Sequence, residues 1–280
     1  QQILPVRFAL PLLLSKEKRA SEMTDLAALA KAAEQTDGSL LGTFTGEDLV
    51  ETFAPYFMPD IIKDKQLDTE KLRTVLQELQ TIAAHCDMVE KYKKGERASN
   101  EWDLPSAMQA VLCQISGFND AMFDLAIINL VKGDYTSFEN AYIPTVEIGV
   151  NANTKQADLA KEFAAFVMSR EVQDGDFYDG FPVNKESLHM QVSLDRSDYA
   201  AYTTIEGADG QEIGLDIEPI KAADADKLEA LCDSLSKKTV KDAKVLEELK
   251  KSVPDYLLGR QSLDDTISKI QDGVKIYLAE

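Results

Sequence analysis

The amino-acid sequence predicts a helix-rich α/β fold, and two features of the chain carry this prediction. Long segments have apolar residues at helical spacing, and single short apolar runs of strand type lie between them. Because strands and helices are interspersed along the chain, we expect crossover connections and a sheet that is covered by helices. No internal repeat and no low-complexity linker interrupts the pattern.

The first predicted element is extended, from Leu4 to Leu14. Pro5 and Pro11 restrict ladder pairing, so this segment is expected to be a strand pair or a strand with a bend. Helical spacing then predicts a helix over about 23–34. A shorter helix, ending near Tyr56, is predicted after a capping box that begins at Thr45.

A long helix is predicted from Asp68, its capping residue, through Ala84, because the apolar positions between them keep helical spacing. The polar segment 91–103 is interpreted as a loop. The apolar run 110–115 is expected to be a buried strand, and the chain returns to helix over 121–131.

The strongest strand candidate is the segment 145–150, which is followed by a helix over 154–169. We expect the runs 3–8, 110–115 and 145–150 to lie in one sheet, with helices on its faces. Beyond residue 191 the chain is acidic and less regularly patterned. Three further helices are predicted at about 224–236, 242–251 and 262–279.

Composition limits the possible functions. The 280 residues suffice for one large or two modest domains, and 49 acidic against 30 basic residues give a formal charge of −19. Such an acidic surface repels phosphate backbones and anionic headgroups, so neither nucleic acid nor a membrane surface is an expected partner. Three cysteines without C-x-x-C spacing (Cys86, Cys113 and Cys232) argue against a disulfide framework.

Motifs that would indicate catalysis are missing from the sequence. It contains no G-x-S-x-G, G-x-x-x-x-G-K-S/T, H-E-x-x-H or G-x-G-x-x-G. The two histidines, His85 and His189, lie where a structural or solvent-exposed role is usual. An acidic run around Asp176 resembles part of a calcium loop, but Lys185 occupies the position of the bidentate carboxylate. We therefore expect a protein without catalytic residues, metal or cofactor.

The remaining candidate residues suit ligand binding. Proteins recognise sugars by stacking aromatic faces on the ring and by hydrogen-bonding its hydroxyl groups through planar polar side chains. Trp102, in a polar loop, is expected either to face a ligand or to cover a helix surface. Phe118, Asn119 and Asp120 follow the predicted strand 110–115 at its carboxyl end, where α/β folds commonly bind ligands. The alternative for this turn is a helix N-cap by Asn119 or Asp120.

Two charged residues complete the candidate set. Arg7 could clamp a carboxylate or a pair of hydroxyl groups, or it could pair with a surface acid. Glu147 stands between two apolar residues of a predicted strand, so its side chain points away from theirs and faces either a cleft or solvent.

Two segments of the chain resemble a known family. In the segment 143–188, a strand ending at Asn151 and Asn153 precedes an amphipathic helix with Phe163 and Phe166 and then a G-F-P-V-N turn. This order resembles the carbohydrate-type extracellular solute-binding proteins (family 1) of bacterial ABC importers, with their "N-x-x-T/S-K-x-x-x-x-A-x-x-F" and "G-F-P-V-N" motifs. The closing segment SLDDTISKIQDGVKIYLAE is also similar to the last helix of that family.

The resemblance implies a periplasmic-binding-protein-like (type II) fold, with two α/β lobes that close on a ligand and with much of the N-terminal lobe outside this chain. Residues 1–150 would form the main part of the second lobe, 151–190 a returning segment of the N-terminal lobe, and 191–280 a helical region packing on the second lobe. The apolar face of the helix 154–169 should then be partly exposed or covered by a neighbouring chain.

The implied function is that of an extracellular substrate-binding component of an ABC importer. It would bind a sugar or oligosaccharide between the lobes and deliver it to a membrane permease, and the full-length protein would be anchored to the cell surface by a lipid. Two alternatives remain open. A glycan-active hydrolase would place two buried carboxylates in the cleft, and a helical interaction module would keep the segment 145–150 away from any cleft.

Overall fold

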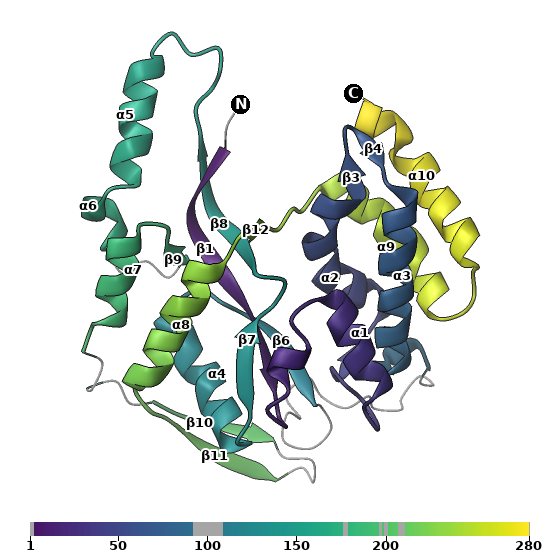
Figure 1. The fold of residues 1–280 in the computed structure, drawn as a ribbon, viewed down its shortest axis with the longest axis horizontal. Helices are drawn as coiled ribbons and strands as arrows, with labels where there is room; N and C mark the ends of the chain where they lie inside the picture. Colours follow the sequence, from purple (N-terminus) through teal and green to yellow (C-terminus); the bar gives the residue numbers. More distant parts are fainter. Residues whose placement is uncertain are drawn as a thin grey trace.

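The computed structural model describes residues 3–91, 109–175, 179–195, 198, 201–206 and 211–279. Within these residues the chain forms two bodies that are joined by a connecting segment, as Figure 1 shows. One body, named the sheet body here, is built on a six-stranded sheet. The other, named the helical body, contains five α-helices that share one hydrophobic core.

The central strand of the sheet is β1 (Ile3–Ser15), which is buried at every residue from Val6 onward. Its first half pairs antiparallel with β8 (Ala141–Gly149), and its second half pairs antiparallel with β6 (Ala110–Ile115). The other strands are β7 (Asp134–Ser137) and β9 (Phe181–Pro182), both antiparallel to β1, and β12 (Lys237–Lys238), which is parallel to β8.

The prediction that three strands share one sheet is confirmed, but the expected connections between them are wrong. β6 and β8 both run antiparallel to β1, whereas crossover units would have made the strands parallel. The apolar pattern of a strand does not encode its direction, and the 13 residues of β1 are long enough to pair with two partners in succession. The predicted bend is present as register shifts on either side of Arg7.

Helices cover the sheet and complete the sheet body. α4 (Phe118–Leu130), α7 (Lys185–Val192) and α8 (Ala222–Ser234) supply residues to the core around β1. The other elements of this body are α5 (Ala157–Val167), α6 (Arg170–Gln173) and the hairpin of β10 (Ala201–Glu206) and β11 (Glu212–Ile217), which contacts α4.

The helical body combines early and late parts of the chain. Its helices are α1 (Leu26–Glu34), α2 (Gly46–Ile61), α3 (Thr69–Ala84), α9 (Ala243–Leu257) and α10 (Leu263–Ala279). Two small strand pairs, β2 (Thr43–Phe44) with β5 (Asp87–Met88) and β3 (Ile62–Lys63) with β4 (Gln66–Leu67), and the 3-10 turns Ala20–Glu22 and Val89–Lys91 connect these elements. Residues 1–150 and 191–280 each contribute to both bodies, so the expected division at residues 150 and 190 does not follow the two cores.

The predicted caps of two helices are confirmed. Thr45 and Asp48 form the capping box of α2, and the Asp68 carboxylate accepts a hydrogen bond from the Lys71 amide at the start of α3. α2 does not end near residue 56, however, and continues through Pro55 and Pro59 to Ile61. Its apolar face continues over these residues, and burial of that face offsets the backbone hydrogen bonds that the prolines lack.

The α5 helix has an exposed apolar face. Leu159, Phe163 and Phe166 are 59%, 59% and 46% exposed, and no residue of α5 is buried. This matches the exposure that the sequence led us to expect. Figure 1 shows α5 at the outer edge of the sheet body, on the side away from the helical body. None of the helices in the described ranges is long and apolar enough to cross a membrane.

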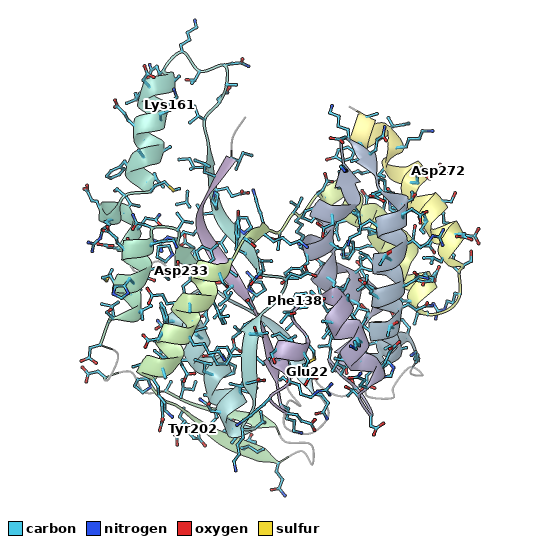
Figure 2. All side chains as sticks on the ribbon, in the orientation of Figure 1. Glu22, Phe138, Lys161, Tyr202, Asp233 and Asp272 are labelled. Atoms are coloured by element: carbon cyan, nitrogen blue, oxygen red, sulfur yellow. The ribbon has the colours of Figure 1, made fainter. Side chains whose placement is uncertain are left out.

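The two bodies meet at the turn between β7 and β8. Phe138 in this turn is fully buried, and its ring packs edge-on against Phe53 and Tyr56 of α2, with ring centroids 5.9 and 5.1 Å away. Figure 2 labels Phe138 where the sheet approaches the helices. A further link is the segment 235–242, named the connecting segment here, which leads from α8 through β12 to α9.

Candidate ligand-binding cleft

A cleft of about 580 Å³ lies where the sheet body and the helical body face each other. This volume falls in the range of small-molecule sites in proteins. Its lining residues come from α2 (Glu51, Thr52, Pro55, Tyr56), β6 (Leu112, Cys113, Gln114), β8 (Ile143, Pro144, Glu147) and the connecting segment (Lys238, Thr239, Val240, Lys241). We call it the interbody cleft.

The α2 wall of the cleft follows from helix geometry. Residues at positions 51, 52, 55 and 56 are spaced by one, three and one, so their side chains lie on one face of the helix. The opposite wall comes from β6 and β8, which pair with the two halves of β1. The wall residues are therefore brought together by tertiary structure, although up to 96 positions separate them along the sequence, between Glu51 and Glu147.

The connecting segment lines the cleft and contacts both bodies. The Thr239 amide donates a hydrogen bond to the Tyr142 carbonyl of β8 at 3.0 Å, and the Val240 amide donates to the Pro55 carbonyl of α2 at 3.0 Å. Pro55 is in the interior of α2, and the connecting segment satisfies its carbonyl oxygen. The same few residues thus line the cleft and join its two walls.

The charged side chains of the cleft are paired. Lys238 forms a salt bridge with Glu147, and Lys241 Nζ lies 3.3 Å from Glu51 Oε1. Lys250, outside the cleft, approaches the other oxygen of Glu51 at 2.8 Å. Hydrogen bonds from Lys250 and then from Lys241 lower the pKa of Glu51, so this carboxylate stays ionised. The charges of the two acidic and the two basic side chains in the lining therefore cancel.

Between these pairs the lining alternates apolar and polar surface. Pro55, Ile143, Pro144 and Val240 supply apolar area, while hydroxyl and amide groups come from the cleft's threonines and from Gln114. Tyr56 is the aromatic residue of the described lining, and it is 6% exposed. Burial raises the pKa of its phenol well above the ordinary value, which keeps the group neutral.

A half-buried carboxyl lies behind the β6 wall. Burial raises the pKa of Asp124 on α4 to about 6, against a weaker opposing effect from the neighbouring Cys113 thiol. The Cys113 thiol donates a hydrogen bond to the Leu12 carbonyl at 3.4 Å, and burial holds its pKa well above the ordinary value. Cys113 is therefore a protonated thiol and a poor nucleophile. In the described residues, no group of three potential metal ligands is clustered.

Of the residues singled out by sequence, Glu147 lines the interbody cleft. Arg7 is 3% exposed, and its guanidinium donates hydrogen bonds of 3.3–3.4 Å to the carbonyl oxygens of Gln173, Gly175 and Gly180. It also lies 3.9 Å from the Asp179 carboxylate. These contacts of Arg7 hold the loop after α6 against the central strand.

The turn at the start of α4 lies outside the residues that line the cleft. The Phe118 ring is 3% exposed and packs edge-on against Phe181 at 5.4 Å, so it belongs to the core of the sheet body. Gly117 is the N-cap of α4, and the Asp120 carboxylate accepts a hydrogen bond from the Ser116 amide. Asn119 is half-buried in the first turn of α4. Trp102 lies outside the described residues, and its role stays a prediction.

Sequence reasoning missed most of the cleft. The polar face of α2 and the run Lys237–Lys238–Thr239–Val240–Lys241 had not been singled out. A basic run in an acidic chain, placed between two predicted helices, was the available signal. Nothing in the sequence indicates that this run lies opposite α2.

Comparison with solved structures identifies the fold. An oligosaccharide periplasmic-binding protein from Synechococcus sp. MITs9220 aligns over 99% of this chain and 72% of its own, with a TM-score of 0.58 and 11% identity. A sugar transporter from Rhizobium etli in an open conformation aligns over 98% and 72%, with a TM-score of 0.57 and 14% identity. The sugar-binding protein MalE from Xanthomonas citri aligns over 98% and 70%, with a TM-score of 0.54 and 13% identity.

The chain therefore has the α/β fold of periplasmic-binding-protein-like sugar-binding proteins, as the sequence resemblance implied. The Synechococcus and Xanthomonas neighbours are described as binding proteins, and the Rhizobium neighbour is described as a sugar transporter. No protein-family model and no curated protein sequence matches the chain.

Proposed function

We propose that this protein binds a sugar or oligosaccharide in the interbody cleft, as the substrate-binding component of an ABC importer. The observation that carries the proposal is the cleft itself. It lies between two bodies of a fold that is shared with sugar-binding proteins, and its charged groups are paired while hydroxyl, amide and apolar surfaces remain. Such a lining is complementary to an uncharged ligand that has both hydroxyl groups and apolar ring faces.

The hydrolase alternative is disfavoured by the state of the cleft carboxylates. Glu51 and Glu147 both line the cleft, as two catalytic acids would. A glycosidase, however, needs one carboxyl with a raised pKa to protonate the leaving group. Glu51 has a lowered pKa because of its two lysine partners, and Glu147 is in a salt bridge with Lys238. This arrangement supports binding without bond cleavage.

The helical interaction module is disfavoured by the position of β8. That alternative predicted that the segment 145–150 would lie away from any cleft. Glu147, within this segment, is one of the lining residues. The connecting segment also hydrogen-bonds to both bodies, which is the arrangement that a cleft needs to respond to a ligand.

Delivery of the ligand to a membrane permease, an extracellular location and a lipid anchor on the full-length protein belong to the same proposal. They rest on the family that the sequence resembles and on structural neighbours that are periplasmic or sugar-transport proteins. The proposal includes no cofactor and no nucleic-acid partner, in keeping with the charge of −19.

A thermal-shift screen against mono- and oligosaccharides tests the proposal. A ligand that binds only the native state raises its stability by RT ln(1 + [L]/Kd), about 2.7 kcal/mol at a hundredfold excess over Kd. We expect one class of sugar to give a shift that saturates at low millimolar concentration. Sugars also stabilise proteins as osmolytes, but that effect needs far higher concentrations and does not discriminate between isomers. Shifts that are equal for all sugars and do not saturate would contradict the proposal.

Trp102 has a specific part in this proposal. Because the described lining offers only the mostly buried Tyr56 as an aromatic surface, we expect Trp102 to supply the stacking face. Trp102→Ala should then weaken sugar binding by about 1–3 kcal/mol in calorimetric titration, with the unfolding temperature nearly unchanged. Unchanged affinity would mean that Trp102 is not part of the site, but it would not contradict the proposal that the sugar binds in the cleft.

A further inference from the structure

The side chain of Lys237 lies between the two bodies. Its ammonium is 2.8 Å from Asp60 Oδ2, near the end of α2 in the helical body, and 2.9 Å from Glu139 Oε2, in the β7–β8 turn where the two bodies meet. Lys237 and Glu139 are mostly shielded, with side chains 24% and 16% exposed. Among the salt bridges of the described residues, this is the one that joins β12 of the sheet body both to α2 of the helical body and to the β7–β8 turn.

Glu139 is held rigidly in place. Its backbone has a positive φ of 59°, an uncommon conformation for a residue with a side chain, and Asn140 follows at 48°. The second carboxylate oxygen of Glu139 accepts a hydrogen bond from the Leu26 amide at the start of α1, at 3.1 Å. Its amide donates to the Thr24 carbonyl. The turn is therefore a fixed point against which Lys237 is positioned.

The charge on Lys237 persists in this setting. Burial of the ammonium opposes ionisation, but the hydrogen bonds to Asp60 and Glu139 outweigh burial and raise its pKa. Lys237 is also adjacent to Lys238, Thr239 and Val240, which line the cleft. Lys237 is thus bonded along the chain to the residues that line the interbody cleft.

We propose that Lys237 is an ionic tie that sets the separation of the helical body and the sheet body, and so controls how far the interbody cleft opens. The tie contacts no part of the cleft volume itself, since Lys237 is not among the lining residues. Only its consequence for ligand affinity rests on the proposed function. The positional effect on the two bodies does not depend on a ligand.

The test measures the distance between the bodies in the full chain without ligand. Spin labels are attached through a genetically encoded ketone amino acid at Asp226, exposed on α8, and Asp272, exposed on α10, which leaves the cysteines unlabelled. Figure 2 labels Asp272 on the outer surface of the helical body. Pulsed electron double resonance then gives the distance distribution for the wild-type chain and each variant.

Lys237→Met removes the charge and keeps an unbranched apolar side chain. We expect a distance distribution that is broader than that of the wild-type chain or shifted from it. The matched control is Lys244→Met, because Lys244 pairs with Glu247 and Glu248 within α9 and links no two bodies. Its distribution should coincide with that of the wild-type chain. If the Lys237→Met distribution also coincides with it, the proposal is overturned.

A second variant covers the case in which Lys237→Met fails to fold. Asp60→Asn removes one half of the tie at a carboxylate that is 41% exposed, and the fold should tolerate this change. We expect a smaller broadening in the same direction, and an unchanged distribution would overturn the proposal. Failure of every sugar to bind would contradict the proposed function, but it would leave these distance measurements and their interpretation unaffected.

Discussion

At the residue scale, Phe138 packs at the junction of the two bodies. It is fully buried although it lies in a turn, and it contacts two aromatic rings of α2. One of them, Tyr56, lines the cleft, so the packing of Phe138 also positions a cleft residue. Aromatic pairs in this edge-on geometry stabilise a core beyond the area that they bury.

Phe138→Ala should lower the free energy of unfolding by about 3–5 kcal/mol, because it leaves a cavity between the bodies. Phe163→Ala is the matched control. This phenylalanine of α5 is 59% exposed, and its loss should change stability by about 0.5 kcal/mol or less. Urea denaturation of both variants measures the difference. Equal effects of the two substitutions would show that Phe138 does not join the bodies.

A second residue-scale prediction concerns pH. Burial raises the folded-state pKa of Asp124 to about 6 from an ordinary value of 3.8. The native state therefore binds more protons than the unfolded state between these values, and stability falls as pH rises through this window. Asp124→Asn removes this dependence. From about pH 3.5 to about pH 7, the unfolding free energy of the variant relative to the wild-type chain should rise by on the order of 2 kcal/mol.

Chemical denaturation at a series of pH values measures this difference. The Asn side chain retains hydrogen-bonding capacity, so the comparison isolates ionisation from loss of volume. A constant difference between variant and wild-type chain across the window would mean that the Asp124 carboxyl ionises in the folded protein as it does in the unfolded chain.

At the element scale, α2 is both a wall of the cleft and the helix that packs against Phe138. Its start is determined locally, by the reciprocal hydrogen bonds between Thr45 and Asp48. The Glu90 carboxylate adds a hydrogen bond to the Gly46 amide at 2.7 Å. These contacts satisfy amide groups that the helix itself leaves unpaired.

Thr45→Ala should destabilise the protein by about 1 kcal/mol, because the Asp48 amide loses its cap. Thr74→Ala is a suitable control, since Thr74 is exposed within α3 and its hydroxyl donates only to the carbonyl four residues earlier. That change should be neutral or slightly stabilising, because alanine has the higher helix propensity. Thermal unfolding followed by circular dichroism distinguishes the two results.

Elements with local signals could be predicted from the sequence, and others could not. Helical periodicity and caps predicted α3 within one residue of its bounds, and they also predicted the presence of α9 and α10. The apolar run that forms β6 was predicted correctly. The β10–β11 hairpin was missed because its region is acidic and has weak alternation. Strand direction in the sheet was also missed, since it depends on tertiary pairing.

The same distinction applies to the candidate site. Glu147 was identifiable because its charge interrupts an apolar strand, and the structure places it at the cleft. Phe118 is an aromatic residue of the kind that stacks on sugars, but its ring fills the core beside Phe181. The pairing of Lys238 and Lys241 with carboxylates from other elements is a long-range property, and no local pattern reveals it.

At the scale of the whole molecule, the two bodies and the connecting segment all contribute residues to the cleft between the bodies. A ligand that contacts both walls would stabilise one relative position of the bodies by its differential affinity for that position. The central claim is therefore that a sugar binds between α2 and the strands β6 and β8, and a substitution that fills this space should abolish binding.

The most direct test is calorimetric titration of the sugar found in the thermal-shift screen against two matched variants. Thr52→Trp places a large side chain on the cleft face of α2, and Thr74→Trp places the same side chain on the exposed face of α3. We predict that Thr52→Trp loses detectable binding while Thr74→Trp retains the wild-type Kd. Both variants should fold as judged by circular dichroism. Wild-type affinity in a folded Thr52→Trp variant would contradict the claim that the interbody cleft is the binding site.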